Sequence, residues 1–514
     1  MNGAEALLRT LCAMGIDTCF SNPGTSEMHF VAAMNCVAGM RGIPVLAEGV
    51  ATGAADGYGR MARRPAATLL HCGPGLANGI ANLHNARRAR TPVVNLIGDL
   101  SHAHRPAAPP LAFDTESLAR SVSSWTRTVL DVHAVSGDGA AAVAAAIGPG
   151  KAISSLILPS DVCWSEGANP AGSLTEARAP SVTSSAIEQG AAWAALGAGT
   201  VLLLGGEALF GEGLALAGAI ARRTGARLMT ESAIARIERG RGRPAVERIP
   251  YAPAAAIEAM AGVDKLLLVG ARRPVFSFAG PDGLSRPERH NIQIAALAHV
   301  EEDISDALVR LAIALGCEPG PSAKSFPSDQ VLPASGEVTA AALAQSLAAL
   351  LPEAAIVVDE SVSFGRSLFP RMGDAAQHDW LQLTGGAIGS GMPMATGAAI
   401  ACPGRRVVNL QADGSALYTV QSLWTQARER LDVTTVILSN RRYAILFDEM
   451  IRVGACVSHT ANDLLSLDRP DIDWARMANA FGVEAERAES MDDFNAAFTR
   501  SLHAGGPRLI ELVL

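Results

Sequence analysis

Short runs of apolar residues alternate with longer amphipathic stretches along nearly the whole chain of 514 residues. The apolar runs have strand length, whereas the stretches between them have the length and apolar spacing of helices. This alternation predicts an α/β protein with mainly parallel sheets flanked by helices. Two stretches dense in Pro, Gly and Ser, 166–185 and 318–338, predict linkers between three domains, at 1–165, 186–317 and 339–514.

The clearest strand and helix pattern lies at 407–440. It contains an apolar run, VVNLQ, a stretch of helical spacing at 416–430, and a second apolar run, VTTVIL. This order predicts two parallel strands joined by a helix, and such crossovers are almost always right-handed. Asp413, just after the first strand, and Asn440, just after the second, should therefore emerge at the same carboxyl-terminal edge of the sheet.

Asp413 and Asn440 offer oxygen atoms that suit a hard cation such as Mg²⁺, which binds few protein ligands and keeps water and phosphate oxygens. Gly414 and Ser415 stand where the next helix is expected to begin, and the N-terminus of a helix favours an anion. These residues alone indicate a site for a metal and a diphosphate. An ordinary βαβ turn, with Asp413 and Asn440 as helix caps, would have the same pattern.

Composition narrows the class of partner. The sequence is 49% hydrophobic, has a net charge of −8, and has no basic run interleaved with aromatic residues. We therefore expect an acidic, soluble protein that binds small molecules or copies of itself, and no nucleic acid. The eight cysteines form no CxxC pair or zinc-type spacing, as expected for reduced thiols. With no signal-peptide pattern and no apolar run of membrane-spanning length, a cytoplasmic protein without membrane contact is expected.

Two candidate catalytic residues follow apolar runs in the N-terminal block. Glu48 stands at the end of the apolar run 43–47, before a Gly-rich helical stretch. Because Ala47, Gly49 and Val50 surround it, its carboxylate is expected to be partly desolvated and to act as an acid or base. A first-turn glutamate that is stabilised by the helix dipole is the alternative. His71 follows a predicted strand at 67–70. A lone histidine in such a loop is more often structural or solvated, and His102 and His104 are given no role.

At these residues the sequence resembles a known family. Three motifs are similar to the pyrimidine-binding domain of the thiamine diphosphate (ThDP) enzymes of the acetolactate synthase and benzoylformate decarboxylase group: NPGTSE (22–27), AEGVATGAADGYGR (47–60) and HCGPGLAN (71–78). Nearer the C-terminus, Ala412-Asp413-Gly414 and Ser439-Asn440 resemble the family signature GDG…NN. Its first Gly and first Asn are replaced, whereas the two metal-binding positions, 27 residues apart, are kept.

The resemblance implies roles for several N-terminal residues. Glu48 would contact N1′ of the ThDP aminopyrimidine and favour the tautomer that removes the proton from C2 of the thiazolium. Asn78 would lie beside the cofactor, and Thr25 would form part of the active-site wall. His71 has the spacing from Glu48 that is found in benzoylformate decarboxylase, where the histidine is an acid or base. Acetolactate synthases have a small polar residue there, and a satisfied core histidine is the alternative.

In the C-terminal block, the resemblance implies that Mg²⁺ is held by Asp413, Asn440 and the main-chain carbonyl of Arg442. Ile388, in the segment GGAIGSGMP, would lie under the cofactor and hold its two rings in a bent V. Read without the family, these glycines indicate a flexible turn that opens a small-residue helix and lets backbone approach a ligand. Tight packing of that helix on a sheet is the alternative.

The central block is predicted to be Rossmann-like, because the apolar runs at 201–204 and 265–269 end in glycines, although neither has GxGxxG. The resemblance makes FAD possible, since the central domain of acetolactate synthase carries it. The phenylalanine that usually follows an arginine in that domain is missing from the segment GARRP at 270–274. FAD is therefore not favoured, and a purely structural domain is preferred.

The leading hypothesis is a ThDP- and Mg²⁺-dependent decarboxylase or carboligase, similar to benzoylformate decarboxylase. It would act on a 2-oxo acid through a C2 ylide and an enamine, with an acceptor aldehyde or ketone when it ligates. One alternative is an acetolactate synthase-type catalytic subunit, and another is a non-catalytic scaffold or regulatory subunit with the same fold. The resemblance also implies a homodimer or homotetramer with the active site at a subunit interface.

Overall fold

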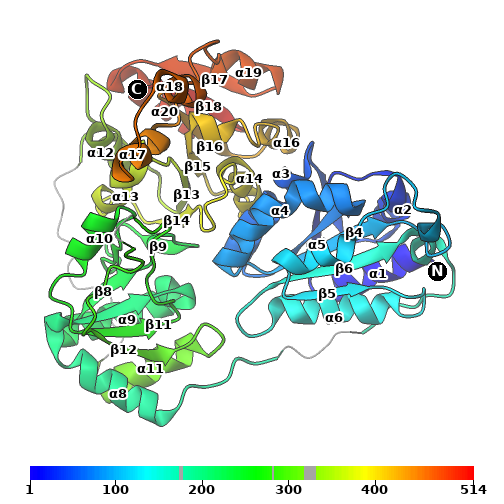
Figure 1. The fold of residues 1–514 in the computed structure, drawn as a ribbon, viewed down its shortest axis with the longest axis horizontal. Helices are drawn as coiled ribbons and strands as arrows, with labels where there is room; N and C mark the ends of the chain where they lie inside the picture. Colours follow the sequence, from blue (N-terminus) through cyan, green and yellow to red (C-terminus); the bar gives the residue numbers. More distant parts are fainter. Residues whose placement is uncertain (173–176, 281–282, 318–330) are drawn as a thin grey trace.

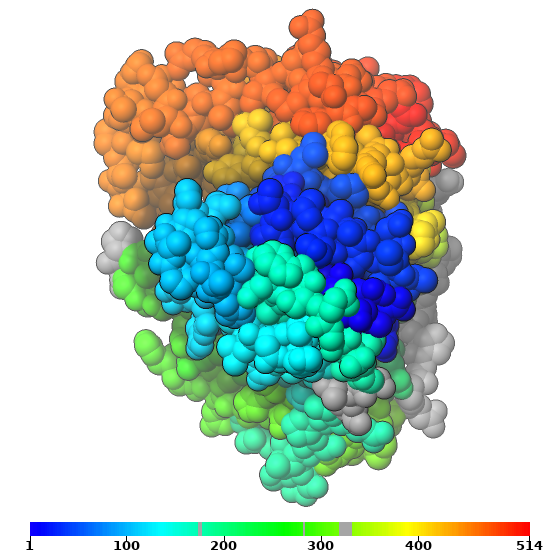
Figure 2. Space-filling view, turned by 90° about the vertical axis from the view of Figure 1, so that its right-hand side faces the viewer, coloured from blue at the N-terminus to red at the C-terminus, as the bar shows by residue number. Residues whose placement is uncertain are grey.

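The computed structural model describes residues 1–172, 177–280, 283–317 and 331–514 (Figure 1). These residues form three sheets flanked by helices, as the alternating pattern predicts. Most of the second predicted linker lies outside the described residues. Figure 2 shows the N-terminal segment between the C-terminal residues on one side and the central residues on the other. No helix of the described residues is long and apolar enough to cross a membrane.

The N-terminal sheet has six parallel strands in the order β2-β1-β3-β4-β6-β5. Its central strands β4 and β6 are buried along their whole length, as expected for a parallel sheet with helices on both faces. The strands are β1 (Thr18–Ser21), β2 (Arg41–Pro44), β3 (Ala66–His71), β4 (Val93–Asp99), β5 (Trp125–Thr128) and β6 (Ile153–Pro159). The helices are α1 (Gly3–Ala13), α2 (Met28–Cys36), α3 (Glu48–Ala62), α4 (Cys72–Ala89), α5 (Thr115–Val122), α6 (Val135–Ile147) and α7 (Ser160–Trp164).

The central sheet has five parallel strands in the order β10-β8-β7-β11-β12. This arrangement confirms the predicted parallel α/β pattern of the block. The strands are β7 (Thr200–Leu204), β8 (Arg227–Thr230), β10 (Glu247–Arg248), β11 (Lys265–Val269) and β12 (Gln293–Ala298). The helices are α8 (Ser184–Ala194), α9 (Gly211–Thr224), α10 (Pro253–Ala259) and α11 (Ile304–Ala314).

The C-terminal sheet has seven strands in the order β17-β18-β16-β15-β13-β14-β9. Only β9 is antiparallel, and it comes from the predicted central block. The other strands are β13 (Ala355–Glu360), β14 (His378–Gln382), β15 (Val407–Ala412), β16 (Val433–Ser439), β17 (Glu484–Ala488) and β18 (Arg508–Val513), with β9 at Ile237–Arg239. The helices are α12 (Ala340–Leu350), α13 (Leu368–Arg371), α14 (Gly391–Ala401), α15 (Asp413–Ala416), α16 (Ser422–Glu429), α17 (Ala444–Arg452), α18 (His459–Leu465), α19 (Trp474–Ala480) and α20 (Met491–His503).

The prediction of a single helix at 416–430 is wrong, because the stretch from 413 to 429 contains two shorter helices, α15 and α16, with a turn between them. Thr419 lies between them, and its hydroxyl donates to the carbonyl oxygen of Gly389 at 2.9 Å. A continuous helix would not leave this turn free to reach the loop before α14. The break is thus a consequence of tertiary contacts that periodicity does not report.

Helices α3 and α14 join the N-terminal and C-terminal domains through close backbone contact. A Cβ at Gly57 would lie 2.0 Å from the carbonyl oxygen of Met394, and a Cβ at Gly397 would lie 1.8 Å from that of Ala54. Only glycine fits at these two crossing positions. Next to them, Arg60 forms a buried ion pair with Asp56 at 2.6 Å.

Candidate active site

Glu48 is the first residue of α3 and follows Ala47, which has extended backbone. Its side chain is 8% exposed. The two carboxylate oxygens accept hydrogen bonds from the amides of Asn22 and Asn78, each at 3.2 Å. No cation among the described residues pairs with it. The structure therefore places a buried carboxylate with neutral partners at the end of the N-terminal sheet.

His71 ends β3 and lies near Glu48, since a Cβ at Gly75 would be 3.3 Å from both Glu48 Oε1 and His71 Cβ. Nδ1 of His71 is 2.9 Å from Oε2 of Glu27, a fully buried carboxylate. Ser26 Oγ lies 3.1 Å from the same nitrogen. Donation of an Nδ1 proton to the carboxylate leaves Nε2 as the ring nitrogen without a hydrogen-bond partner among the described residues.

Two glycines leave space for this pair. A Cβ at Gly24 would lie 2.3 Å from the His71 ring, and a Cβ at Gly98 would lie 1.7 Å from Oε1 of Glu27. The main-chain N–H of Gly24 also donates to Oε2 of Glu27 at 2.7 Å. The position of the carboxylate is therefore determined by both packing and hydrogen bonds.

Cys72 adjoins this pair, and its Sγ is 3.3 Å from Ser26 Oγ. Its ligand atom and those of Glu27 and His71 all lie within 4.8 Å of one another, close enough to share a metal ion. Burial, the main cause, raises the pKa of the Cys72 thiol to about 11. A protonated thiol is a poor metal ligand, so hydrogen bonding accounts better for this cluster.

Asp413 lies at the end of β15, as the sequence predicts, and is 3% exposed. Its carboxylate accepts main-chain N–H groups of Gly414 at 2.8 Å and Arg441 at 2.6 Å. Burial raises the pKa of this carboxyl, and the main-chain donors oppose the shift. The segment that follows β16 therefore wraps around Asp413, which brings Asn440 to the same edge.

Asn440 and Arg442 both offer oxygen atoms at this edge. The amide oxygen of Asn440 accepts the main-chain N–H of Arg442 at 3.1 Å. Within the described ranges, the carbonyl oxygen of Arg442 accepts no hydrogen bond. A carbonyl without a protein donor and a buried carboxylate form a donor set that suits a hard cation.

Gly414 and Ser415 belong to α15, which is only four residues long. A Cβ at Gly414 would lie 2.5 Å from the Tyr443 ring, so a larger residue does not fit there. The hydroxyl of Ser415 donates to Ala412 O at 3.1 Å and accepts from Nε2 of Gln411 at 2.6 Å. The long helix that was expected to direct its dipole at an anion is thus absent. A short backbone turn stands in its place at this edge of the sheet.

Ile388 is half-buried in the loop before α14. The buried carboxylate of Glu360, at the end of β13, accepts the main-chain N–H groups of Gly389 and Gly391, each at 2.7 Å. Burial raises the pKa of this carboxyl. Thr419 holds the carbonyl of Gly389. The backbone on the C-terminal side of Ile388 is therefore fixed by the C-terminal domain.

Two asparagines of α4 hold the backbone on the two sides of Ile388. Nδ2 of Asn85 donates to Ala387 O at 2.7 Å, and Nδ2 of Asn82 donates to Gly49 O at 2.8 Å and to Gly389 O at 3.3 Å. Sequence reasoning missed both asparagines. With Asn78 they recur at helical spacing, one turn and two turns along one face, which is a signal that the sequence carries.

The remaining predicted residues lie at the edges of this arrangement. Thr25 is exposed in the 3₁₀ turn Thr25–Glu27, beside Ser26. Asn78 is exposed, and its side-chain amide donates to Glu48. His102 is paired with the surface residue Asp161 at 3.0 Å, and the exposed His104 likewise lies outside the group around His71.

This arrangement has two halves: acid and base candidates at one sheet edge, and a candidate metal–diphosphate edge on another. Two family models match the chain, "Thiamine pyrophosphate enzyme, N-terminal TPP binding domain" over residues 1–118 and the corresponding C-terminal TPP binding domain over 369–512. The chain belongs to the thiamine pyrophosphate enzyme family, in the acetolactate synthase and benzoylformate decarboxylase group.

Its similarity to individual proteins extends over the whole length. It is 46% identical to the "Putative acetolactate synthase large subunit IlvX" of Mycobacterium tuberculosis, over 100% of this chain and 99% of that protein. It is 29% identical to benzoylformate decarboxylase of Pseudomonas aeruginosa, over 97% and 96%. Among solved structures, the ThDP-dependent 4-hydroxybenzoylformate decarboxylase of Rhodococcus jostii superposes with a TM-score of 0.83 at 25% identity, over 99% and 98% of the two chains.

Proposed function

We propose that this chain is a ThDP- and Mg²⁺-dependent decarboxylase or carboligase of a 2-oxo acid, similar to benzoylformate decarboxylase. The observation that carries the proposal is the oriented pair Glu27–His71 beside the buried Glu48. A histidine whose Nδ1 is held by a buried carboxylate presents Nε2 for proton transfer. The similarity to two benzoylformate-type decarboxylases supports the same reaction class.

Bound ThDP would supply a carbon nucleophile and an electron sink for decarboxylation. Glu48 would hold a proton on the pyrimidine N1′, and its two amide partners, Asn22 and Asn78, would keep the carboxyl group oriented. His71 would donate a proton to the product carbon, or accept one from the substrate side, through Nε2. Burial of Glu48 keeps bulk water from competing for this proton.

Mg²⁺ would be held by Asp413, the amide oxygen of Asn440 and the carbonyl oxygen of Arg442. The donor set is all oxygen, as Mg²⁺ requires, and leaves positions for diphosphate oxygens and water. Gly414 and Ser415 would contact the diphosphate, because the turn that they form has no room for a larger side chain and lets the main chain approach a ligand closely.

Ile388 would support the bent cofactor, and its backbone is held from both sides by hydrogen bonds. Thr25 would form part of the active-site wall, and Asn78 would lie beside the cofactor. Asn78 and the half-exposed Tyr418 leave this region open in a single chain. We therefore propose a homodimer or homotetramer in which a second copy covers the site.

An acetolactate synthase-type activity is the second candidate, favoured by the similarity to the mycobacterial protein described as an acetolactate synthase large subunit. The two candidates differ at the step after decarboxylation. A protonated product gives an aldehyde, whereas a second 2-oxo acid as acceptor gives an acetohydroxy acid. The Glu27–His71 pair favours protonation.

The test is a screen of pyruvate, benzoylformate and branched 2-oxo acids with the purified protein, ThDP and Mg²⁺. CO₂ release and the organic products are followed together, in wild type and His71→Ala. The proposal expects an aldehyde from wild type and a loss of aldehyde formation in the variant. Acetohydroxy acid as the main product from pyruvate, with His71→Ala as active as wild type, would establish the synthase alternative instead.

A further inference from the structure

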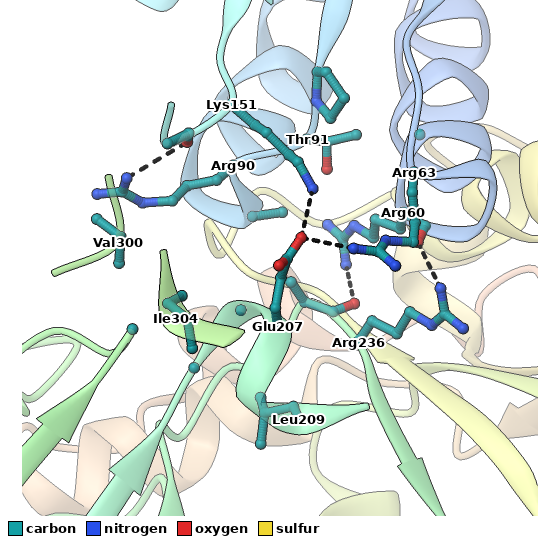
Figure 3. Close-up of a pocket in the computed structure, with 18 of the residues that line it drawn as sticks. Arg60, Arg63, Arg90, Thr91, Lys151, Glu207, Leu209, Arg236, Val300 and Ile304 are labelled. Atoms are coloured by element: carbon teal, nitrogen blue, oxygen red, sulfur yellow. Dashed lines mark hydrogen bonds and ion pairs between the residues drawn. The ribbon is translucent and has the colours of Figure 1, made fainter. Parts of the chain in front are cut away.

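The loop 384–391, which contains Ile388, is held at both of its ends. At its first end, the guanidinium of Arg60, a buried group that lines the cavity shown in Figure 3, donates to Oγ1 of Thr384 at 3.1 Å. The hydroxyl of Thr384 in turn donates to the carbonyl oxygen of Asn85 at 2.7 Å. Both contacts come from the N-terminal domain.

The other end of the loop is held by Glu360, which is buried at the end of β13. Oε1 accepts the main-chain N–H groups of Gly389 at 2.7 Å and Ser390 at 3.3 Å, and Oε2 accepts that of Gly391 at 2.7 Å. One carboxylate thus binds three successive main-chain groups just after Ile388. Because three fixed dipoles point at one charge, the carboxylate determines the path of the backbone and not only the place of one atom.

Gln411 connects this carboxylate to the turn that follows β15. Its Nε2 lies 2.9 Å from Oε2 of Glu360 and 2.6 Å from Oγ of Ser415, and it donates to both. An amide nitrogen has two hydrogens, so both donors of Gln411 are used. The side chain of Gln411 is fully buried, so bulk water can replace neither partner.

Packing and a further hydrogen bond fix the orientation of this amide. A Cβ at Gly391 would lie 2.2 Å from Oε1 of Gln411, so only glycine at the start of α14 leaves room for the amide. The same oxygen accepts from Nδ2 of Asn409 at 3.4 Å. Gln411 therefore joins the loop of Ile388 to the turn at Ser415 in one orientation.

We propose that Glu360 and Gln411 are positioning residues that fix the loop of Ile388 relative to the turn at Asp413, Gly414 and Ser415. The inference rests on the proposed function, in which the diphosphate binds at this turn and the cofactor rings rest on Ile388. Both contacts are then made to one molecule, so a shift between the two segments moves C2 relative to the group that removes its proton. A misplacement of about 1 Å can slow a reaction by about 10²-fold.

Gln411→Leu is the main test, because it removes both donors at nearly the same side-chain volume. In the full-length protein, the C2 proton of bound ThDP should exchange about tenfold or more slowly than in wild type, as expected for a misplaced reacting carbon. The Kd for ThDP with Mg²⁺ should change less than about threefold, because neither side chain touches the cofactor in this proposal.

Gln426→Leu is the matched control for the loss of a buried amide. Nε2 of Gln426 donates to Met392 O at 3.3 Å and to Thr396 Oγ1 at 3.0 Å, so it also makes two buried bonds beside α14. It contacts neither the loop of Ile388 nor the turn at Ser415 through these bonds. Gln426→Leu should therefore leave C2 proton exchange and the Kd for ThDP unchanged, and an equal fall in exchange for both variants would contradict the proposal.

A double-mutant cycle with Ile388→Ala separates positioning from general stability. In the Ile388→Ala background, Gln411→Leu should slow C2 proton exchange less than about threefold, because the side chain to be positioned is gone. Two independent effects would multiply instead, and that result would show that Gln411 does not act through Ile388.

Exchange of main-chain amides, followed by mass spectrometry, gives a readout that needs no reaction. ThDP with Mg²⁺ should slow amide exchange in the segment 387–391 about tenfold in wild type and in Gln426→Leu, and much less in Gln411→Leu. Equal slowing in all three proteins would overturn the proposal.

Glu360→Gln tests the other member of the link. It should slow C2 proton exchange at least as much as Gln411→Leu, because an amide has a single oxygen for three N–H groups. Thermal melting without ligand shows which variants are folded, and Gln411→Leu decides the proposal even if Glu360→Gln does not fold. Absence of ThDP binding to wild type would overturn the proposed function and this inference with it, whereas ThDP binding with wild-type exchange in Gln411→Leu would overturn this inference alone.

Discussion

The carboxyl-terminal edges of the first and third sheets follow one plan of parallel strands but hold their polar groups differently. At the first edge, Glu48 and Glu27 bond to the side chains of Asn78 and His71. At the third edge, Asp413 and Glu360 accept mainly main-chain N–H groups. Histidine and hydroxyl partners can exchange protons, whereas main-chain N–H groups are fixed dipoles that stabilise charge. The first edge is suited to proton transfer and the third to holding a fixed charge.

The sharpest test of the first edge is Glu48→Gln. The amide cannot exchange a proton, so kcat should fall about 10³-fold, within the range for loss of an acid or base. ThDP affinity should change little, since the shape is kept. Exchange of the C2 proton of bound ThDP, followed by NMR, is the direct measurement. Exchange at the wild-type rate would remove Glu48 from the mechanism, and Glu5→Gln, on the surface of α1, serves as the control.

Glu27→Gln should lower kcat about 10²-fold, because an amide donor in place of Oε2 opposes the Nδ1 proton of His71. The KM for ThDP should stay near the wild-type value, as the cofactor does not touch this pair in our proposal. Glu27→Asp should recover part of the loss by restoring the carboxylate. Equal activity of all three proteins would show that the orientation of His71 is irrelevant.

For the third edge, Asp413→Ala should raise the Kd for ThDP in the presence of Mg²⁺ about 10- to 100-fold, from the loss of a charged ligand. Fluorescence titration at several Mg²⁺ concentrations measures this, and the dependence on Mg²⁺ should disappear. Asp432→Ala is the matched control, because Asp432 lies just before β16 at the opposite edge of the same sheet. Cofactor binding that still depends on Mg²⁺ in the Asp413 variant would contradict the metal assignment.

His378, at the amino-terminal edge of the third sheet, predicts an acid effect on stability that does not involve the site. Burial lowers its pKa from 6.5 to about 4. Between about pH 6.5 and pH 4, His378 is therefore protonated in the unfolded chain but not in the folded chain. The free energy of unfolding falls as the pH is lowered through this range. The loss from this group is about 3 kcal/mol over that range. Denaturant unfolding of wild type and His378→Gln should show a shallower pH slope in the variant, and equal slopes would contradict this account.

Asn85→Ala should have the smallest effect, a loss of about 1 to 2 kcal/mol in the free energy of unfolding, because it leaves Ala387 O without its donor. A modest fall in kcat should accompany it, as the backbone beside Ile388 loosens. Asn495→Ala removes an amide bond to Ala334 O far from the site, and it should cost less stability, because Asn85 makes further hydrogen bonds, with no change in kcat. A fall in kcat for both variants would show that the loss of activity follows from lower stability and not from the backbone beside Ile388.

The positions of the polar residues at the two sheet edges could largely be predicted from the sequence, because they depend on the order of strands and helices along the chain. Asp413 and Asn440 follow strands of one βαβ unit, and the handedness of the crossover places them at one edge. Glu27 and Asn85 were missed because their partners lie 44 and 302 positions away, beyond any local pattern.

The glycine crossing of α3 and α14 has a consequence for protein engineering. Because backbone meets backbone at Gly57 and Gly397, nearly every substitution there would separate the two domains that carry the two halves of the proposed site. Variation that retunes substrate choice is therefore best sought elsewhere. Helix α17, which has no buried residue and begins just after the proposed metal-binding segment, is an element where a mutant library should tolerate many changes.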